Sequence, residues 1–253
     1  MAPSMEEDLI RIISSQVSAL GRPDLYRPPL VSFSWADDSR YPALKKIIGE
    51  WHRNPCELLP DAKSLISYFV PFTKEVVMEP KKLVNGSPLW SEAYQEINRD
   101  FDLINDALAH YLNHRGYSAL SIKSTHTYDP GDLKSAWSHR SAAVIAGLGA
   151  FGANRMVITE KGSGGRFSTV ITSAHLKAQS KPVGNKCLYF ENGSCALCFK
   201  VCPVGALTEH SMDKFACQDE LNKNESLLKS VSSLQSADTC GKCISICPFA
   251  YIE

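Results

Sequence analysis

The sequence predicts an α+β protein of two unequal domains, and two observations carry this prediction. Segments with helical and with extended hydrophobic patterns alternate over residues 1–178, which is typical of a layered α/β or α+β domain. Residues 179–253 instead hold eight of the nine cysteines. A chain of 253 residues is long enough to bury a sizeable core and to divide in this way. We therefore expect an α/β domain over 1–178 and a cysteine-rich domain over 179–253.

The elements of the first domain follow from the spacing of its apolar residues. Spacings of three and four predict helices over 5–20, which ends at Gly21, and over 91–115, which ends at Gly116. A third helix is expected over 133–145. Clusters of β-branched and aromatic residues predict strands over 64–72, 117–122, 155–159 and 167–173.

The cysteines of the second domain form two runs of the pattern C-x2-C-x3-C-P. In two-cluster ferredoxins, two thiolates of such a run ligate one cubane iron–sulfur cluster, and the cysteine before proline ligates the other. Together with two isolated cysteines, the runs supply two sets of four ligands. We expect Cys187, Cys195, Cys198 and Cys247 to hold a first [4Fe-4S] cluster, and Cys202, Cys217, Cys240 and Cys243 to hold a second.

The first run departs from the regular spacing at one ligand. A regular run would place a cysteine three residues before Cys195, where this chain has Asn192. Cys187 lies five residues further upstream, so the intervening residues must loop out for its thiolate to reach the cluster. Cys187 is the best candidate because it completes the set. The alternatives are a cluster with one labile iron, or a non-cysteine ligand such as the Asn192 side chain.

Zinc and disulfides are the competing interpretations of these cysteines. Zinc sites use paired C-x2-C units, but they do not call for a further cysteine followed by proline. Disulfides need an oxidising compartment, and the N-terminal Met-Ala-Pro-Ser-Met-Glu-Glu-Asp has neither the basic nor the apolar region of a secretory signal. Cys56 lies outside both sets, and we expect it to be a packed free thiol.

Charge and hydropathy restrict the partners. The chain has 27 basic and 27 acidic residues, so no net charge draws it to nucleic acid or anionic lipid. No uninterrupted apolar run approaches the ~20 residues of a membrane span. We therefore expect a cytoplasmic protein without a membrane span.

The run Gly147-Leu-Gly149-Ala-Phe-Gly152 matches the G-x-G-x-x-G pattern of dinucleotide-binding turns. That pattern should follow a strand, open a helix and precede an acidic residue by ~20 positions. Here the preceding segment has a helical pattern, the following one is extended, and no acidic residue lies near position 172. We therefore expect the glycines to allow close approach of the backbone to a packed element or a large planar ligand.

Together these segments resemble the epoxyqueuosine reductases and, more distantly, the corrinoid-dependent reductive dehalogenases, over residues 55–250. Residues 59–66 (LPDAKSLI) are similar to the family's LPGAKSVI strand, and residues 146–154 (AGLGAFGAN) to its AGLGWIGKN. Residues 162–172 resemble its GSWFFLGEILT. Cys217 stands where the family has an isolated cysteine between its two runs.

The resemblance implies a nitroreductase-like α/β domain that binds cobalamin, followed by a bacterial ferredoxin-like module with two [4Fe-4S] clusters. It also implies that the cobalamin is base-off, with which the absence of an Asp-x-His-x-x-Gly motif agrees. The residues expected to form the corrinoid seat are Gly147, Leu148, Gly149, Ala150, Phe151, Gly152, Ala153 and Asn154, with Gly162 and Ser163.

The chain departs from the family at the catalytic acid. The family carries this acid in an Asp-x-x-Pro-x-x-Glu-Arg stretch, where this chain aligns Leu133 with the acid and His139 with the glutamate. Asp132, one position away, or His139 could serve as the proton donor instead. The sequence also lacks the C-terminal repeat region that many family members use toward tRNA, so we expect tRNA not to be a partner.

The expected function is therefore a cobalamin-dependent iron–sulfur oxidoreductase. Electrons from a low-potential donor of the ferredoxin or flavodoxin type would pass through two clusters to a base-off corrinoid. The substrate would be a small organic molecule or a corrinoid protein rather than epoxyqueuosine in tRNA. The alternative is a non-catalytic electron-transfer or cobalamin-binding protein that serves another corrinoid protein. Loss of the aligned acid favours this alternative.

Overall fold

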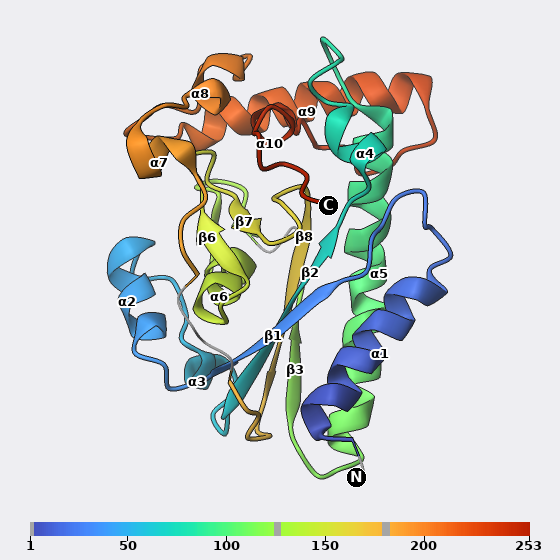
Figure 1. The fold of residues 1–253 in the computed structure, drawn as a ribbon, viewed down its shortest axis with the longest axis vertical. Coiled ribbons are helices and arrows are strands. Elements are labelled where there is room, and N and C mark those ends of the chain that lie inside the picture. The colour runs from blue at the N-terminus through green and yellow to red at the C-terminus, as the bar shows by residue number, and fades with distance from the viewer. Residues whose placement is uncertain (1–2, 124–127, 179–182) are drawn as a thin grey trace.

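A four-stranded antiparallel sheet forms the centre of the molecule (Figure 1). The computed structural model describes residues 3–123, 128–178 and 183–253. The strand order is β1-β2-β8-β3, and every residue of β2 is buried. The mixed α/β class that the sequence predicts is confirmed. The strands are β1 (Leu30–Trp35), β2 (Ser64–Pro71), β3 (Ala119–Ile122) and β8 (Gly165–Thr172).

Helices cover the sheet (Figure 1). The helices α1 (Met5–Ala19) and α5 (Pro88–Asn113) pack together, and α5 contacts β3 and β8. The helix α6 (His139–Ile145) packs on β1, β2 and β8, with α2 (Arg40–Ile47) beside it. The short elements are α3 (Pro55–Leu58), α4 (Lys74–Met78), β4 (Tyr128–Asp129), β5 (Lys134–Ser135), β6 (Gly149–Phe151) and β7 (Val157–Thr159).

The cysteine-rich region adds four helices above the sheet in the view of Figure 1. They are α7 (Leu188–Asn192), α8 (Leu197–Val201), α9 (Lys214–Val231) and α10 (Lys242–Ser245). Asn224 of α9 accepts a hydrogen bond from the Gly86 amide and donates one to the Thr239 carbonyl, so α9 is tied to the segment before α5. The predicted domain boundary after residue 178 adjoins residues 179–182, which lie outside the described residues.

The predicted elements agree with the structure at most positions. The helices expected over 5–20 and 91–115 are α1 and α5, and the four expected strands are β2, β3, β7 and β8. The strand β1 was not predicted. No helix within the described part of the chain has both the length and the apolar character that a membrane span needs.

The helix expected over 133–145 is wrong in its first half. Residues 129–135 form a tight turn between β4 and β5, in which Asp129 accepts the Gly131 amide and Asp132 accepts the Lys134 amide. Such aspartate turns compete with helix formation, and they hold Leu133 at a positive φ of 53°. The helix therefore begins only at His139, where the Ser138 side chain accepts the Ser141 amide.

A buried polar network joins the sheet to α5. The Tyr68 hydroxyl of β2 donates to Asn105 Oδ1 at 2.8 Å, and Asn105 Nδ2 donates to Ser168 Oγ of β8 at 3.1 Å. Asn105 is 0% exposed. Because burial without a partner would penalise each of these groups, the network fixes the position of α5 on the two central strands.

We expect Asn105→Ala to lower the free energy of unfolding by about 2–3 kcal/mol, because it leaves the buried Tyr68 hydroxyl unpaired and opens a small cavity. Urea unfolding followed by circular dichroism measures this loss. Asn113→Ala, an exposed change at the end of the same helix, should alter the free energy by no more than about 0.5 kcal/mol. Equal effects of the two substitutions would contradict the role of the network.

Candidate functional site

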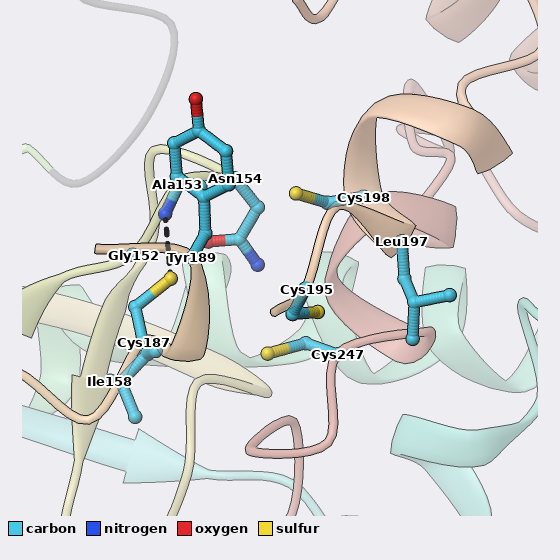
Figure 2. A pocket seen from close by; sticks show the side chains of 10 residues that line it. All are labelled: Gly152, Ala153, Asn154, Ile158, Cys187, Tyr189, Cys195, Leu197, Cys198 and Cys247. Carbon is cyan, nitrogen blue, oxygen red and sulfur yellow. Dashed lines mark hydrogen bonds between the residues drawn. The ribbon is translucent and has the colours of Figure 1, made fainter. Parts of the chain in front are cut away.

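The four cysteines expected to hold the first cluster line one cavity. Figure 2 shows the thiols of Cys195, Cys198 and Cys247 on one side of this space, and Cys187 on the other. Cys187 lies beside the turn that contains Ala153 and Asn154. Cysteines that are up to 60 positions apart in the sequence are thus brought together by the fold.

The irregular spacing before Cys195 is accommodated by the helix α7. Cys187 is the residue that precedes α7, and its amide donates to Asn185 Oδ1 at 2.8 Å. The Ala153 amide donates to the Cys187 sulfur at 3.4 Å. Asn192, the alternative ligand, is exposed, accepts the Ser194 amide and does not line the cavity. The geometry therefore favours Cys187 over Asn192.

The thiols of the second set of cysteines raise one another's pKa values. Burial raises the pKa of the Cys243 thiol to about 12, and repulsion from Cys240, Cys217 and Cys202 adds to the rise. Burial also raises the pKa of the Cys217 thiol to about 11, with Cys240 and Cys202 again contributing. Cys217 lies in the first turn of α9. The four cysteines expected to hold the second cluster therefore lie within electrostatic range of one another.

Repulsion between thiols also links the four cysteines of the first set. Burial raises the pKa of the Cys247 thiol to about 11, and Cys187, Cys195 and Cys198 contribute repulsion. Thiols with such pKa values keep their protons at neutral pH unless a bound cation compensates the thiolate charge. Both sets therefore have the chemistry of a buried site that becomes favourable when a polynuclear cation fills it.

The donor arrangement is unlike that of a single-ion site. Within residues 3–123, 128–178 and 183–253, no three His, Cys, Asp or Glu side chains lie close enough together to hold one metal ion. The ligands of a cubane attach to separate irons, so they stand further apart than the ligands of one ion. All nine cysteines are free thiols. Cys56 is exposed on α3, so the expectation that it is packed was wrong.

Glycine is required in this run because the backbone packs closely against the neighbouring strand. The run leads from α6 into the hairpin of β6 and β7, so its context is not that of a dinucleotide-binding turn. A Cβ atom on Gly149 would lie 2.3 Å from the Ile158 carbonyl oxygen of the partner strand. Three amides of this run are already used, because Gly147, Leu148 and Gly152 donate to backbone carbonyls, and the next amide, that of Ala153, donates to a thiol. Ala150 and Phe151 remain partly exposed.

The second expected corrinoid segment is covered by the chain itself. Gly162 and Ser163 are buried, and the Ser163 amide donates to the Ala250 carbonyl at 3.1 Å. A Cβ atom on Gly162, whose φ is +97°, would lie 2.5 Å from the same carbonyl oxygen. These two residues face the C-terminal segment rather than a ligand, so the geometry gives no support to their role in a corrinoid seat.

Neither candidate proton donor holds an available proton at neutral pH. Asp132 is exposed and pairs with Lys134 at 2.7 Å, and this hydrogen bond lowers the pKa of its carboxyl group. His139 Nε2 lies 3.0 Å from the Lys123 carbonyl, which only accepts, so Nε2 carries the hydrogen and Nδ1 accepts from Thr169 Oγ1. Burial lowers the pKa of His139 to about 4. Their assignment as donors stays a prediction.

One contributor to the site was missed by sequence reasoning. Tyr189 of α7 lines the cavity beside the four cysteines, and the irregular spacing before Cys195 was the signal for it. Asn154 was predicted as part of the corrinoid seat. It accepts the Met156 amide with its Oδ1 and donates its Nδ2 to the Cys243 carbonyl at 3.2 Å, so it ties the second cysteine run to the hairpin.

Comparison with known proteins agrees with these features. The chain is 27% identical to the epoxyqueuosine reductase of Bacillus cereus over 213 residues, which is 79% of this chain and 51% of that protein. It is 26% identical to the enzyme of Bacillus subtilis over 209 residues, 77% of this chain and 49% of that one. The chain thus spans about half the length of the curated relatives it matches. No family model matches it.

Solved structures share the fold. An epoxyqueuosine reductase with a tRNA-Tyr epoxyqueuosine-modified tRNA stem loop aligns with a TM-score of 0.59 at 21% identity, covering 97% of this chain and 65% of that one. A reductive dehalogenase described with a mechanism for B12-dependent dehalogenation aligns with a TM-score of 0.58 at 16% identity, covering 88% and 30%. The predicted resemblance is confirmed. The chain is similar to epoxyqueuosine reductases in sequence and fold, and to reductive dehalogenases in fold.

The half-buried, neutral His139 predicts a dependence of stability on pH. Its pKa of about 4 in the fold is below the ~6.5 of an unfolded histidine, so unfolding takes up a proton between these values. The stability that His139 contributes is complete above about pH 6.5 and is lost as the pH falls toward about 4.

We therefore expect the urea midpoint of the wild type to fall more between about pH 7.5 and about pH 5 than that of His139→Asn. His210→Asn, a change at an exposed histidine, should retain the wild-type dependence. An identical pH dependence of the wild type and His139→Asn would contradict the neutral state of His139.

Proposed function

We propose that the chain is an iron–sulfur oxidoreductase that holds two [4Fe-4S] clusters in a ferredoxin-like module. The observation that carries this proposal is the convergence of Cys187, Cys195, Cys198 and Cys247 on one cavity. In this proposal the cysteine before Pro248 crosses from the second run to the first set. Bound clusters of this kind supply one-electron transfer.

The surrounding residues have definable roles at the first set. The Ala153 amide donates to the Cys187 sulfur and so stabilises its thiolate. Asn154 connects the same turn to the backbone of Cys243, so it fixes the two sets relative to each other. The half-buried apolar side chains of Phe199, Ile246 and Phe249 pack around these cysteines and limit the access of water.

We further propose that the nitroreductase-like α/β domain binds a corrinoid, which would supply low-potential cobalt chemistry. The support comes from the fold shared with a reductive dehalogenase described as B12-dependent. Within this chain, the partly exposed residues Ala150 and Phe151 fit such a contact better than the covered Gly162 and Ser163. The amides of Gly147, Leu148 and Gly152 are not proposed as its donors, because they already donate to backbone carbonyls.

The reduced substrate is proposed to be other than epoxyqueuosine in tRNA. The position aligned with the family's acid is Leu133, and the nearby Asp132 is ionised and paired with Lys134. A fold neighbour binds a tRNA stem loop, so the expectation that tRNA is no partner stays a prediction. The same lack of a proton donor favours a second candidate function, in which the chain delivers electrons to a separate corrinoid protein.

Anaerobically reconstituted protein is expected to hold about eight iron and eight sulfide per chain, because eight cysteines supply two full ligand sets. Iron and acid-labile sulfide assays with electron paramagnetic resonance of the reduced protein measure this. Cys247→Ser should lose the signal of one cluster and keep the other. Cys56→Ser, at an exposed thiol outside both sets, should change neither.

Two results would overturn the cluster assignment. Stoichiometric zinc in place of iron would show that the thiols form single-ion sites. Loss of the same cluster from Cys247→Ser and Cys243→Ser would show that the ligation does not cross between the runs.

The chain is expected to bind cob(II)alamin in base-off form, because no histidine-donor motif is present in the sequence. Electron paramagnetic resonance of a titration should show cobalt without splitting from an axial nitrogen. Phe151→Asp should weaken binding by about tenfold, because it places a charge where an apolar contact is proposed. Axial nitrogen splitting, or no binding by the wild type, would contradict the proposal.

A further inference from the structure

The cavity of the first cysteine set has an inner and an outer wall. Its inner wall consists of buried residues, among them Ala153, Asn154 and Ile158. Two of the non-cysteine residues that line it are not buried, Tyr189 and Leu197, and Leu197 is 41% exposed. These two side chains therefore lie on the solvent-facing side of the cavity.

Tyr189 is held in this wall by contacts to two other segments. Its ring meets the Phe199 ring of α8 edge to face, with centroids 5.2 Å apart and an interplanar angle of 86°. The Glu209 side chain, in the segment between α8 and α9, lies near its hydroxyl and raises the pKa of Tyr189. A ring that packs edge to face on a second ring is more restricted than a freely moving surface side chain.

The position of Tyr189 depends on the irregular cysteine spacing. Regular spacing would leave two residues before Cys195, whereas this chain has seven between Cys187 and Cys195. Most of those residues form the helix α7. This helix is capped at its C-terminal end by Gly193, which has a left-handed φ of 72°. This helix therefore supplies Tyr189, which lines the cavity together with Cys187 and packs on the Phe199 ring.

We propose that the inserted helix α7 places Tyr189 as a cover over the first cluster, which keeps water away from it and lowers its reduction potential. This inference rests on the proposed function. Reduction adds a negative charge to a group that four thiolates already make anionic, and water stabilises that added charge. Excluding water therefore disfavours the reduced state. It also slows attack by oxygen and loss of iron.

The test compares three substitutions in the reconstituted protein. Tyr189→Ser should shift the midpoint potential of one cluster to a more positive value and speed its bleaching in air several-fold. Tyr189→Phe keeps the ring and should remain close to the wild type. Leu227→Ser, at a position of α9 that is 43% exposed and does not line the cavity, should change neither quantity. Potentiometric titration followed by electron paramagnetic resonance, and iron release to a chelator, are the measurements.

The outcomes separate this inference from the function on which it rests. If the wild type holds no cluster, the proposed function fails. If the wild type and Tyr189→Ser hold two clusters with equal potentials and equal lifetimes in air, the cover alone fails. Should Tyr189→Ser contain less iron than the wild type, Tyr189→Leu replaces it, with the same direction of shift expected, and an unchanged potential again refutes the cover.

Discussion

The contact between the C-terminal segment and the loop before β8 is the constraint on which the site depends. The amides of Ser163 and Gly164 donate to the Ala250 carbonyl at 3.1 and 2.9 Å, and Gly162 leaves no room there for a side chain. Ala250 follows Cys247 by three residues, and the loop leads directly into a central strand of the sheet. The contact therefore fixes one proposed cluster ligand to the most buried part of the fold.

The hairpin of β6 and β7 provides the second connection. Its turn donates from Ala153 to the Cys187 sulfur, and from Asn154 to the Cys243 carbonyl. One turn therefore reaches both sets of cysteines. These connections are hydrogen bonds to backbone atoms or sulfur at close approach, which explains why glycines recur in the two loops although the glycine run lacks the context of a dinucleotide-binding turn. The segments that suggested a ligand seat in the sequence also position cysteines of the proposed clusters.

Local patterns in the sequence predicted the parts of the fold that depend on local physics. The apolar spacing in α1 and α5 and the β-branched runs of β2 and β8 identified those elements, and the cysteine spacing identified the two sets that the fold brings together. The start of α6 was missed because the side chains of Asp129 and Asp132 form local turns. The burial of Gly162 and the wall formed by Tyr189 were missed because both depend on segments distant in sequence.

The described residues include a set of groups suited to electron transfer, but no comparable proton donor near Leu133. Its eight clustered thiols, buried or half-buried with several pKa values raised, suit a module that gains stability by binding iron and can then pass electrons. Among the residues that the structure describes, no equivalent proton donor lies at the family's acid position: Leu133 replaces the acid, Asp132 is paired with Lys134, and His139 uses both ring nitrogens. A substrate that needs only electrons, or whose proton comes from water or a partner protein, is therefore the chemistry that this arrangement fits. For this reason delivery of electrons to a corrinoid is the function common to both candidates.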